Sequence, residues 1–94
     1  LASCGGGPSE DEKHKAVAAA KIAYAKAKQA GTDFSGGPCI AEHLPALPDW
    51  VADVAHDPRQ SVDDDPANQC SRAREGDADH FVELNPAGNL IRTQ

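Results

Sequence analysis

The histidines are the first side chains to consider for chemistry, because imidazole is a frequent metal ligand and general base. The chain has four of them, His14, His43, His56 and His80, and none lies in a compact zinc motif such as H-E-x-x-H. His56 with His80 is the pair that we keep as candidate metal ligands. The alternative for His56 is a partly buried histidine that is hydrogen-bonded within the fold.

Two carboxylate–histidine pairs have a spacing of three residues, Asp53 with His56 and His80 with Glu83. Both pairs fall in segments whose alternating pattern predicts β-strands. Residues three apart in a strand point to opposite faces of a sheet. We therefore expect neither pair to converge on a metal ion.

Three consecutive aspartates, Asp63 to Asp65, offer the hard oxygen ligands that calcium prefers. The calcium-loop template fails here, because counting from Asp63 puts Asn68 at the glycine position and Arg74 at the glutamate position. A non-standard site with Asp63 and Asp65 as ligands remains one hypothesis. A solvated loop in which Asp65 caps a helix is the other.

The cysteines are Cys4, Cys39 and Cys70, and no two are spaced as C-x-x-C. We predict a Cys39–Cys70 disulfide, which closes a loop of about 32 residues and contributes roughly 3.7 kcal/mol in the chain-entropy description. Two buried thiols are the alternative. A Cys39–His56 pair resembles the nucleophile and base of a thiol hydrolase, but a disulfide at Cys39 removes that nucleophile.

No other motif indicates catalysis. The sequence has neither a G-x-S-x-G elbow nor a phosphate-binding loop, since Gly5–Gly7 and Gly36-Gly37 lack the following G-K-[ST]. With few aromatic residues, a deep apolar pocket is not expected. We predict a protein that is not an enzyme and that uses no cofactor.

Large apolar residues are scarce: Leu, Ile, Val and Phe make up 15 of the 94 residues. A domain this small and this poor in core-forming side chains normally requires a covalent crosslink, a metal or a partner. This composition agrees with the predicted disulfide around residues 39–70. Residues 10–94 are expected to form one small domain, preceded at residues 1–9 by a flexible tether.

An alanine-rich helix is predicted over residues 10–30. Ser9 followed by Glu12 fits a capping box, and the acidic residues at 10–12 suit the positive end of the helix dipole. No Gly or Pro interrupts the segment, and Gly31 is placed to end it. One narrow stripe of Val17, Ala20, Tyr24 and Ala27 can pack on a sheet but cannot build a core alone.

The second half of the chain predicts strands and a short helix. Residues 50–56 alternate as a strand does, and Asp65-Pro66 begins a helix that Gly76 ends, with Cys70 in its middle. Residues 81–92 predict a hairpin around Asn85-Pro86-Ala87-Gly88, with Leu84 facing Asn89 and Val82 facing Ile91. The fold class is therefore α+β. We expect a long N-terminal helix packed on a small antiparallel sheet with a C-terminal hairpin, stapled by one disulfide.

Charge is divided unevenly along the chain. Residues 1–34 have five lysines and four acids, a balance of +1, whereas residues 35–94 have four arginines and eleven acids, a balance of −7. An acidic domain is repelled by phosphate backbones, which argues against nucleic acid as a partner. The lysines of the helix are either its solvated face or a contact with an anionic membrane surface.

Leu1-Ala2-Ser3-Cys4 resembles the lipobox of bacterial lipoproteins, in which Leu and two small residues precede an invariant cysteine. The resemblance covers four residues and implies that Cys4 is acylated and that the precursor is cut before it. Gly5 to Ser9 would then be the tether. An incidental cysteine and an intermolecular disulfide are the alternatives for Cys4.

These features together predict a lipid-anchored extracytoplasmic module at the bacterial cell envelope or cell surface. With no pocket or catalytic motif expected, such a module would act through contacts with another protein or subunit, as a binding or structural element. The second hypothesis is a small secreted domain that binds calcium or zinc or that hydrolyses a substrate.

Overall fold

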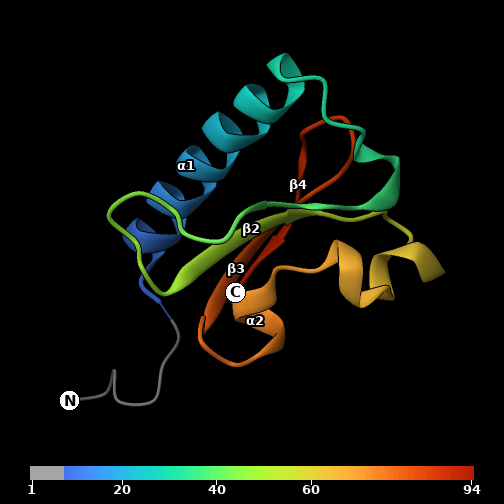
Figure 1. Cartoon of the computed structure of the whole chain (residues 1–94). Coiled ribbons are helices and arrows are strands. Elements are labelled where there is room, and N and C mark those ends of the chain that lie inside the picture. The colour runs from blue at the N-terminus through green and yellow to red at the C-terminus, as the bar shows by residue number, and fades with distance from the viewer. Residues whose placement is uncertain (1–7) are drawn as a thin grey trace.

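In the computed structural model, which describes residues 8–94, one long helix covers one face of a four-stranded sheet (Figure 1). Cys4 and the rest of residues 1–7 lie outside the described residues. The predicted fold class, α+β with one disulfide, is confirmed, because Cys39 and Cys70 are bonded with their Cα atoms 4.8 Å apart. In chain order the elements are α1 (Glu10–Gln29), η1 (Phe34–Gly36), β1 (Cys39–Ala41), β2 (Trp50–Val54), η2 (Ser61–Asp64), η3 (Pro66–Asn68), α2 (Ser71–Arg74), β3 (His80–Leu84) and β4 (Leu90–Thr93).

The sheet is mixed, in the order β1-β2-β3-β4, and this differs from the antiparallel sheet expected. β1–β2 and β3–β4 are antiparallel, but the central strands β2 and β3 run parallel. Parallel neighbours need a long crossover connection, and residues 55–79 supply one that contains η2, η3 and α2. Figure 1 shows α1 on one side of the sheet and α2 on the other.

Helix α1 begins and ends where the sequence predicts. The Ser9 hydroxyl caps its start by accepting a hydrogen bond from the Glu12 N–H, at 3.1 Å. At its end, the Thr32 N–H donates to the Ala27 carbonyl, which is a common way for a helix to stop at a glycine. The Glu12 carboxylate does not complete the capping box but accepts a hydrogen bond from the Trp50 indole N–H, at 2.8 Å. One polar contact therefore fixes the first turn of α1 against the sheet.

The main core lies between α1 and the sheet. Ala16 and Ala20, one helical turn apart, are fully buried, because their small side chains let the helix approach the strands closely. The predicted stripe is confirmed in part: Ala20 is buried and Val17 and Tyr24 pack against the core, but the fully buried Ala16 was not included in it. The remaining buried members of the cluster come from the loop between β1 and β2 and from the two central strands: Leu44, Trp50, Ala52, Val82 and Leu84.

The predicted helix after Asp65 is shorter than expected. Asp65 is an N-cap as predicted, but of the short η3, and Cys70 is the N-cap of α2 rather than a mid-helix residue. Extended backbone at Gln69 and Cys70 separates the two pieces and lets Cys70 meet Cys39. The Glu42 carboxylate accepts hydrogen bonds from the first two N–H groups of α2, which fixes where that helix begins.

The hairpin is confirmed, but its predicted register is wrong. Leu84 pairs with Leu90 rather than Asn89, and Val82 pairs with Thr93 rather than Ile91. Two features shift the register: Gly88 takes a φ of 90° in the turn, and Ile91 is an extra residue in β4, between the partners of Leu84 and Glu83. A Cβ on Gly88 would also lie 2.7 Å from the ring of Tyr24, so α1 packs directly against this turn.

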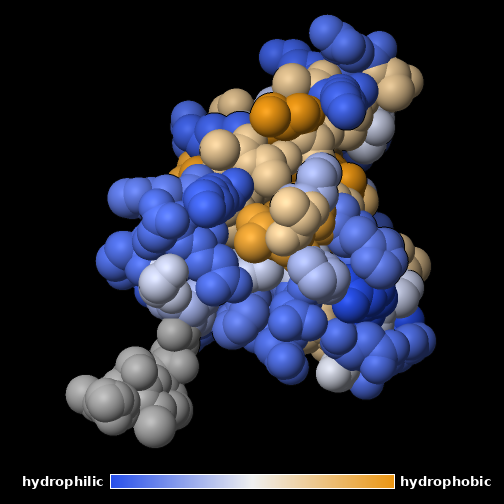
Figure 2. Space-filling model, turned by 90° about the vertical axis from the view of Figure 1, so that its left-hand side faces the viewer, coloured by the Kyte–Doolittle hydropathy of each residue, from blue (hydrophilic) through white to orange (hydrophobic). Residues whose placement is uncertain are grey.

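The surface of the α1 side carries the most exposed apolar residues. Ile22 is 59% and Leu90 is 44% exposed, and Figure 2 shows apolar atoms gathered over this side of the molecule. A hollow of about 430 Å³ lies there, lined in part by Val17, Ala18 and Leu90. Among the helices of residues 8–94, none combines the length and the apolar character that crossing a membrane requires.

Candidate functional site

The candidate site lies on the sheet face that is turned away from α1. Alternation along β2 sends Trp50 and Ala52 to the α1 core and Val51 and Asp53 to the other face. The parallel register pairs Asp53 with Glu83, so two carboxylates stand side by side on neighbouring strands. Like charges directly opposite each other destabilise a sheet, and this arrangement needs compensation from its surroundings.

Two arginines compensate Glu83, which is only 6% exposed. Arg59 donates through Nη1 to one oxygen at 3.2 Å, and Arg92 donates through Nε to the other at 2.9 Å. Arg59 is itself held by Asp64, at 3.0 Å, and by the main-chain carbonyl of Asp63. Charge-assisted bonds of this kind fix both partners in position, and Glu83 has a guanidinium on each carboxylate oxygen.

Asp53 has no such compensation. Its Oδ1 is buried and has no hydrogen-bond partner among the described residues. Burial is the main cause that raises the pKa of Asp53 to about 7, and the negative charge of Glu83 adds to it while Arg59 opposes it. This carboxyl group therefore exchanges its proton near neutral pH, unlike an ordinary surface aspartate.

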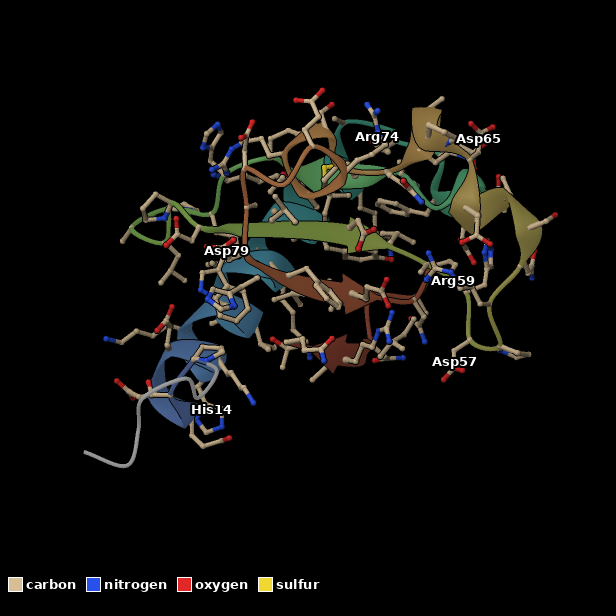
Figure 3. All side chains as sticks on the ribbon, turned by 90° about the horizontal axis from the view of Figure 1, so that it is seen from below. His14, Asp57, Arg59, Asp65, Arg74 and Asp79 are labelled. Carbon is tan, nitrogen blue, oxygen red and sulfur yellow. A yellow bond between two sulfur atoms is a disulfide. The ribbon has the colours of Figure 1, made fainter. Side chains whose placement is uncertain are left out.

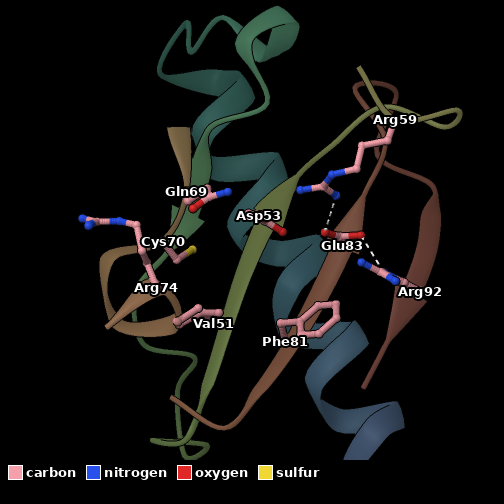
Figure 4. Close-up of a pocket in the computed structure, with 10 residues that line it drawn as sticks. Val51, Asp53, Arg59, Gln69, Cys70, Arg74, Phe81, Glu83 and Arg92 are labelled. Carbon is pink, nitrogen blue, oxygen red and sulfur yellow. Dashed lines mark hydrogen bonds and ion pairs between the residues drawn. The ribbon is translucent and has the colours of Figure 1, made fainter. Parts of the chain in front are cut away.

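Asp53 and Glu83 line a pocket of about 230 Å³ between the sheet and the crossover segment (Figure 4). Val51, Cys70, Ala73 and Phe81 give the pocket an apolar part. The Arg92 guanidinium carbon lies 5.3 Å from the centre of the Phe81 ring and closes one side. Figure 4 shows Arg74 extending away from Asp53, so its charge does not replace the missing partner.

Next to the pocket, the Asp63 carboxylate holds several residues of the crossover segment together through hydrogen bonds. Its carboxylate accepts hydrogen bonds from the N–H groups of His56, at 3.0 Å, and Gln60, at 2.9 Å, and contacts the His56 ring at 3.0 Å. Burial alone would raise its pKa, but these hydrogen bonds outweigh burial and lower it. Gly37 lies against this carboxylate so closely that a Cβ there would overlap Asp63 Oδ1.

Of the four candidate metal ligands, the structure brings together only His56 and Asp63, which contact each other at 3.0 Å. Asp63 is engaged by His56 and main-chain donors, and the Asp65 carboxylate accepts a hydrogen bond from the Ala67 N–H. His80 lies on the Trp50 ring, with ring centres 5.0 Å apart. Figure 3 shows Asp57 and Asp79, the chain neighbours of His56 and His80, at opposite ends of the β2–β3 pair.

Cysteine chemistry is also constrained by the fold. Within residues 8–94, one group of metal-ligating side chains has its atoms within 4.8 Å of one another, and it comprises Cys39, Glu42 and Cys70. Both of its sulfur atoms are used in the disulfide, and the Glu42 carboxylate caps α2. The Cys39–His56 pair considered above therefore has no free thiol in this structure.

The Asp53 pocket was missed by the sequence analysis, which examined Asp53 and Glu83 only as partners of nearby histidines. A signal for it exists in the sequence. In both WVADV and HFVEL an acid stands fourth, on the face opposite the residues that enter the α1 core. The parallel pairing of β2 with β3 is what places these two acids side by side, and no pairing between these two segments was predicted from the sequence.

Comparison of the chain with protein-family models, with curated proteins and with solved structures finds no match.

Proposed function

We propose that this chain is an extracytoplasmic binding module, tethered to a membrane through Cys4, that acts by docking to another protein. The observation that carries the docking part is the Asp53 pocket. It holds the half-buried carboxyl group of Asp53, whose Oδ1 atom is buried without a hydrogen-bond partner, beside the ion pairs of Glu83 with two arginines. Pockets with perturbed ionisable groups are frequent at functional sites.

The disulfide supports the extracytoplasmic part of the proposal. Disulfides form and persist mainly in oxidising compartments and are rare in the cytosol. The Cys39–Cys70 bond joins β1 to the crossover segment that covers the pocket face. The disulfide that holds the pocket together is therefore one that an oxidising compartment would preserve.

The resemblance of LASC to a lipobox supports the membrane tether. Residues 5–9 span at most about 18 Å when fully extended, so an acylated Cys4 would hold α1 close to the lipid surface. Two acyl chains give stable anchoring, because each buried methylene contributes about 0.8 kcal/mol. Docking would then take place close to the membrane.

The anchor is tested by fractionation of the full-length precursor in a bacterial host. Cys4→Ser should move the protein from the membrane fraction to the soluble fraction or block its processing. The melting temperature should stay unchanged, because the structural disulfide uses the other two cysteines. A Cys4→Ser protein that remains with the membranes would refute the tether.

The docking face is tested by site-specific photo-crosslinking in intact cell envelopes. A photoreactive residue at Arg74, on the rim of the pocket, is compared with one at Lys21 on the exposed side of α1. Both sites are exposed cationic positions in helices, so they are matched controls. We expect a discrete crosslinked product from position 74 alone. Equal products from both positions, or none from position 74, would contradict docking at this face.

A further inference from the structure

We infer that the outer face of α1 lies on an anionic lipid surface, so that the tethered module turns the opposite face of its sheet toward its partners. The inference deepens the proposed function and depends on it for the membrane tether. Three features carry it: the unpaired lysines of α1, the charge of the rest of the chain, and the position of α1 next to the tether.

The lysines of α1 fall into two groups. Two of them pair with acids of the first turn, Lys13 with Glu10 at 3.7 Å and Lys15 with Asp11 at 3.5 Å. The other three are exposed and have no carboxylate within ion-pair distance among residues 8–94: Lys21, Lys26 and Lys28. The second half of α1 therefore presents three ammonium groups that are free to pair with an external anion.

These lysines lie on both sides of an exposed apolar strip. An α-helix turns by about 100° per residue, so Ala18, Ile22 and Ala25 stand opposite the two buried alanines that face the sheet. Ile22 is 59% exposed, and the strip continues through the hollow to Leu90, on β4 (Figure 2). Lysines 15 and 26 flank the strip on one side, and lysines 21 and 28 on the other. Lysine stems lie along apolar surface of this kind while their charged tips reach outward, as at membrane interfaces.

The rest of the chain has the opposite charge. Residues 19–30 have three lysines and no acid, a balance of +3, whereas residues 31–94 have four arginines and twelve acids, a balance of −8. Asp33, the first acid after the helix, accepts hydrogen bonds from the N–H and hydroxyl groups of Ser35. An anionic surface therefore attracts the second half of α1 and repels the crossover side, which contains the three consecutive aspartates.

The position of α1 in the chain brings this face to the lipid. The proposed tether ends at Ser9, the N-cap of α1, and the 20 residues of the helix extend over about 30 Å. The helix can thus lie along the surface with its first turn next to the anchor. Figure 1 shows α2 on the far side of the sheet from α1, so the Asp53 pocket then faces away from the lipid. Each lysine near an anionic surface favours this orientation by about fivefold.

The test uses the full chain coupled through Cys4 to a maleimide lipid in nanodiscs. Cys4 is the thiol that reacts, because the other two cysteines form the disulfide. A gadolinium-chelating lipid in the disc broadens the NMR signals of amides close to the surface. In discs rich in phosphatidylglycerol, we expect much stronger broadening at Ala18, Ile22 and Ala25 than at Arg74. In phosphatidylcholine discs this difference should disappear, and equal broadening of both sides in the anionic discs would overturn the inference.

Two double variants with the same charge change separate the patch from overall charge. Replacing Lys21 and Lys28 by Gln should lower the ratio of the two orientations by about 25-fold, at about fivefold per lysine. Replacing Lys13 and Lys15 by Gln should change it by less than about fivefold, because these lysines already pair with acids. Equal effects of the two double variants would overturn the inference.

A second copy of the chain is the competing occupant of this face. Light scattering of the untethered chain should show a monomer. A dimer that is lost when Ile22 is replaced by Ser would assign the face to a second copy and overturn the inference.

The outcomes also separate this inference from the proposed function. If Cys4→Ser releases the protein and position 74 gives its crosslinked product, but the coupled chain shows equal broadening of both sides, the proposed function stands and the lipid-facing helix is wrong. If Cys4→Ser stays with the membranes while the coupled chain broadens at α1, the acyl tether is wrong and the affinity of α1 for anionic lipid stands.

Discussion

On the side covered by α1, the sheet presents Trp50, Ala52 and Leu84, all fully buried against small residues of the helix. One residue further along β2, on the opposite face, Asp53 stands beside Glu83 under a crossover made of short helical pieces. The first face is packed mainly from apolar side chains, with one charged contact between Glu12 and Trp50. The second is held by ion pairs and a disulfide, so the two faces of one sheet are stabilised by different kinds of interaction.

The largest effect is expected on the α1 side. Trp50→Ala should lower the free energy of unfolding by about 3–5 kcal/mol, because it removes a fully buried ring and leaves a cavity. It also removes the donor to Glu12. Chemical denaturation followed by circular dichroism measures the change. Ile22→Ala is the control, since Ile22 lies exposed on α1, and a comparable loss of stability there would contradict the importance of the buried Trp50.

The next effect is expected on the crossover side. Replacing both Cys39 and Cys70 by Ala should cost roughly 3.7 kcal/mol, the loop-closure contribution of the disulfide. Photo-crosslinking from position 74 should decrease as well, because the crossover that carries α2 loses its attachment to β1. Denaturation under oxidising conditions gives the value. A decrease in the free energy of unfolding of less than about 1 kcal/mol would mean that the ion pairs, and not the disulfide, stabilise the crossover side.

Asp53 provides a pH-dependent contrast between the two faces. Its folded pKa of about 7 lies above the ordinary value of 3.8, so its ionisation destabilises the native state as pH rises through 7. The stability of Asp53→Asn relative to wild type should thus improve by about 2–3 kcal/mol between pH 5 and pH 9. Urea unfolding at the two pH values tests this. Asp49→Asn should show no such trend, and an equal trend there would remove Asp53 as the cause.

The smallest effect concerns the one hydrogen bond that joins α1 to the hairpin turn. The Tyr24 hydroxyl donates to the Pro86 carbonyl at 2.7 Å, and its ring stacks on Phe34. Tyr24→Phe keeps the ring and should cost about 1 kcal/mol, or roughly 4–8 °C in melting temperature. Differential scanning calorimetry measures the shift. An effect as large as that of Trp50→Ala would show that polar contacts dominate this face too.

Local features of the fold could be predicted from the sequence because their causes are local. The cap at Ser9 and the end of α1 before Gly31 depend on residues within a few positions. The Cys39–Cys70 pairing followed from the need of a small core for a crosslink. Each of these inferences used a single segment or a single constraint.

Features that depend on distant segments could not be predicted in this way. The parallel pairing of β2 with β3 depends on how residues 55–79 cross the sheet. The break before α2 depends on Glu42, which lies in another loop. The candidate pocket could not be predicted for the same reason, because the pairing of β2 with β3 is what makes Asp53 and Glu83 neighbours. The sequence of either strand alone does not indicate that its acidic residue is functional.

The position of β3 has a consequence for how the protein is made. Although it comes late in the chain, this strand lies between β2 and β4 and contributes Val82 and Leu84 to the core around Ala16 and Ala20. During synthesis from the N-terminus, α1 and β2 emerge with their apolar sides uncovered until β3 follows. A nascent chain interrupted before residue 80 would lack the central strand and expose Trp50 to chaperones and proteases. Native folding of this unit therefore requires that residues 80–84 have been synthesised.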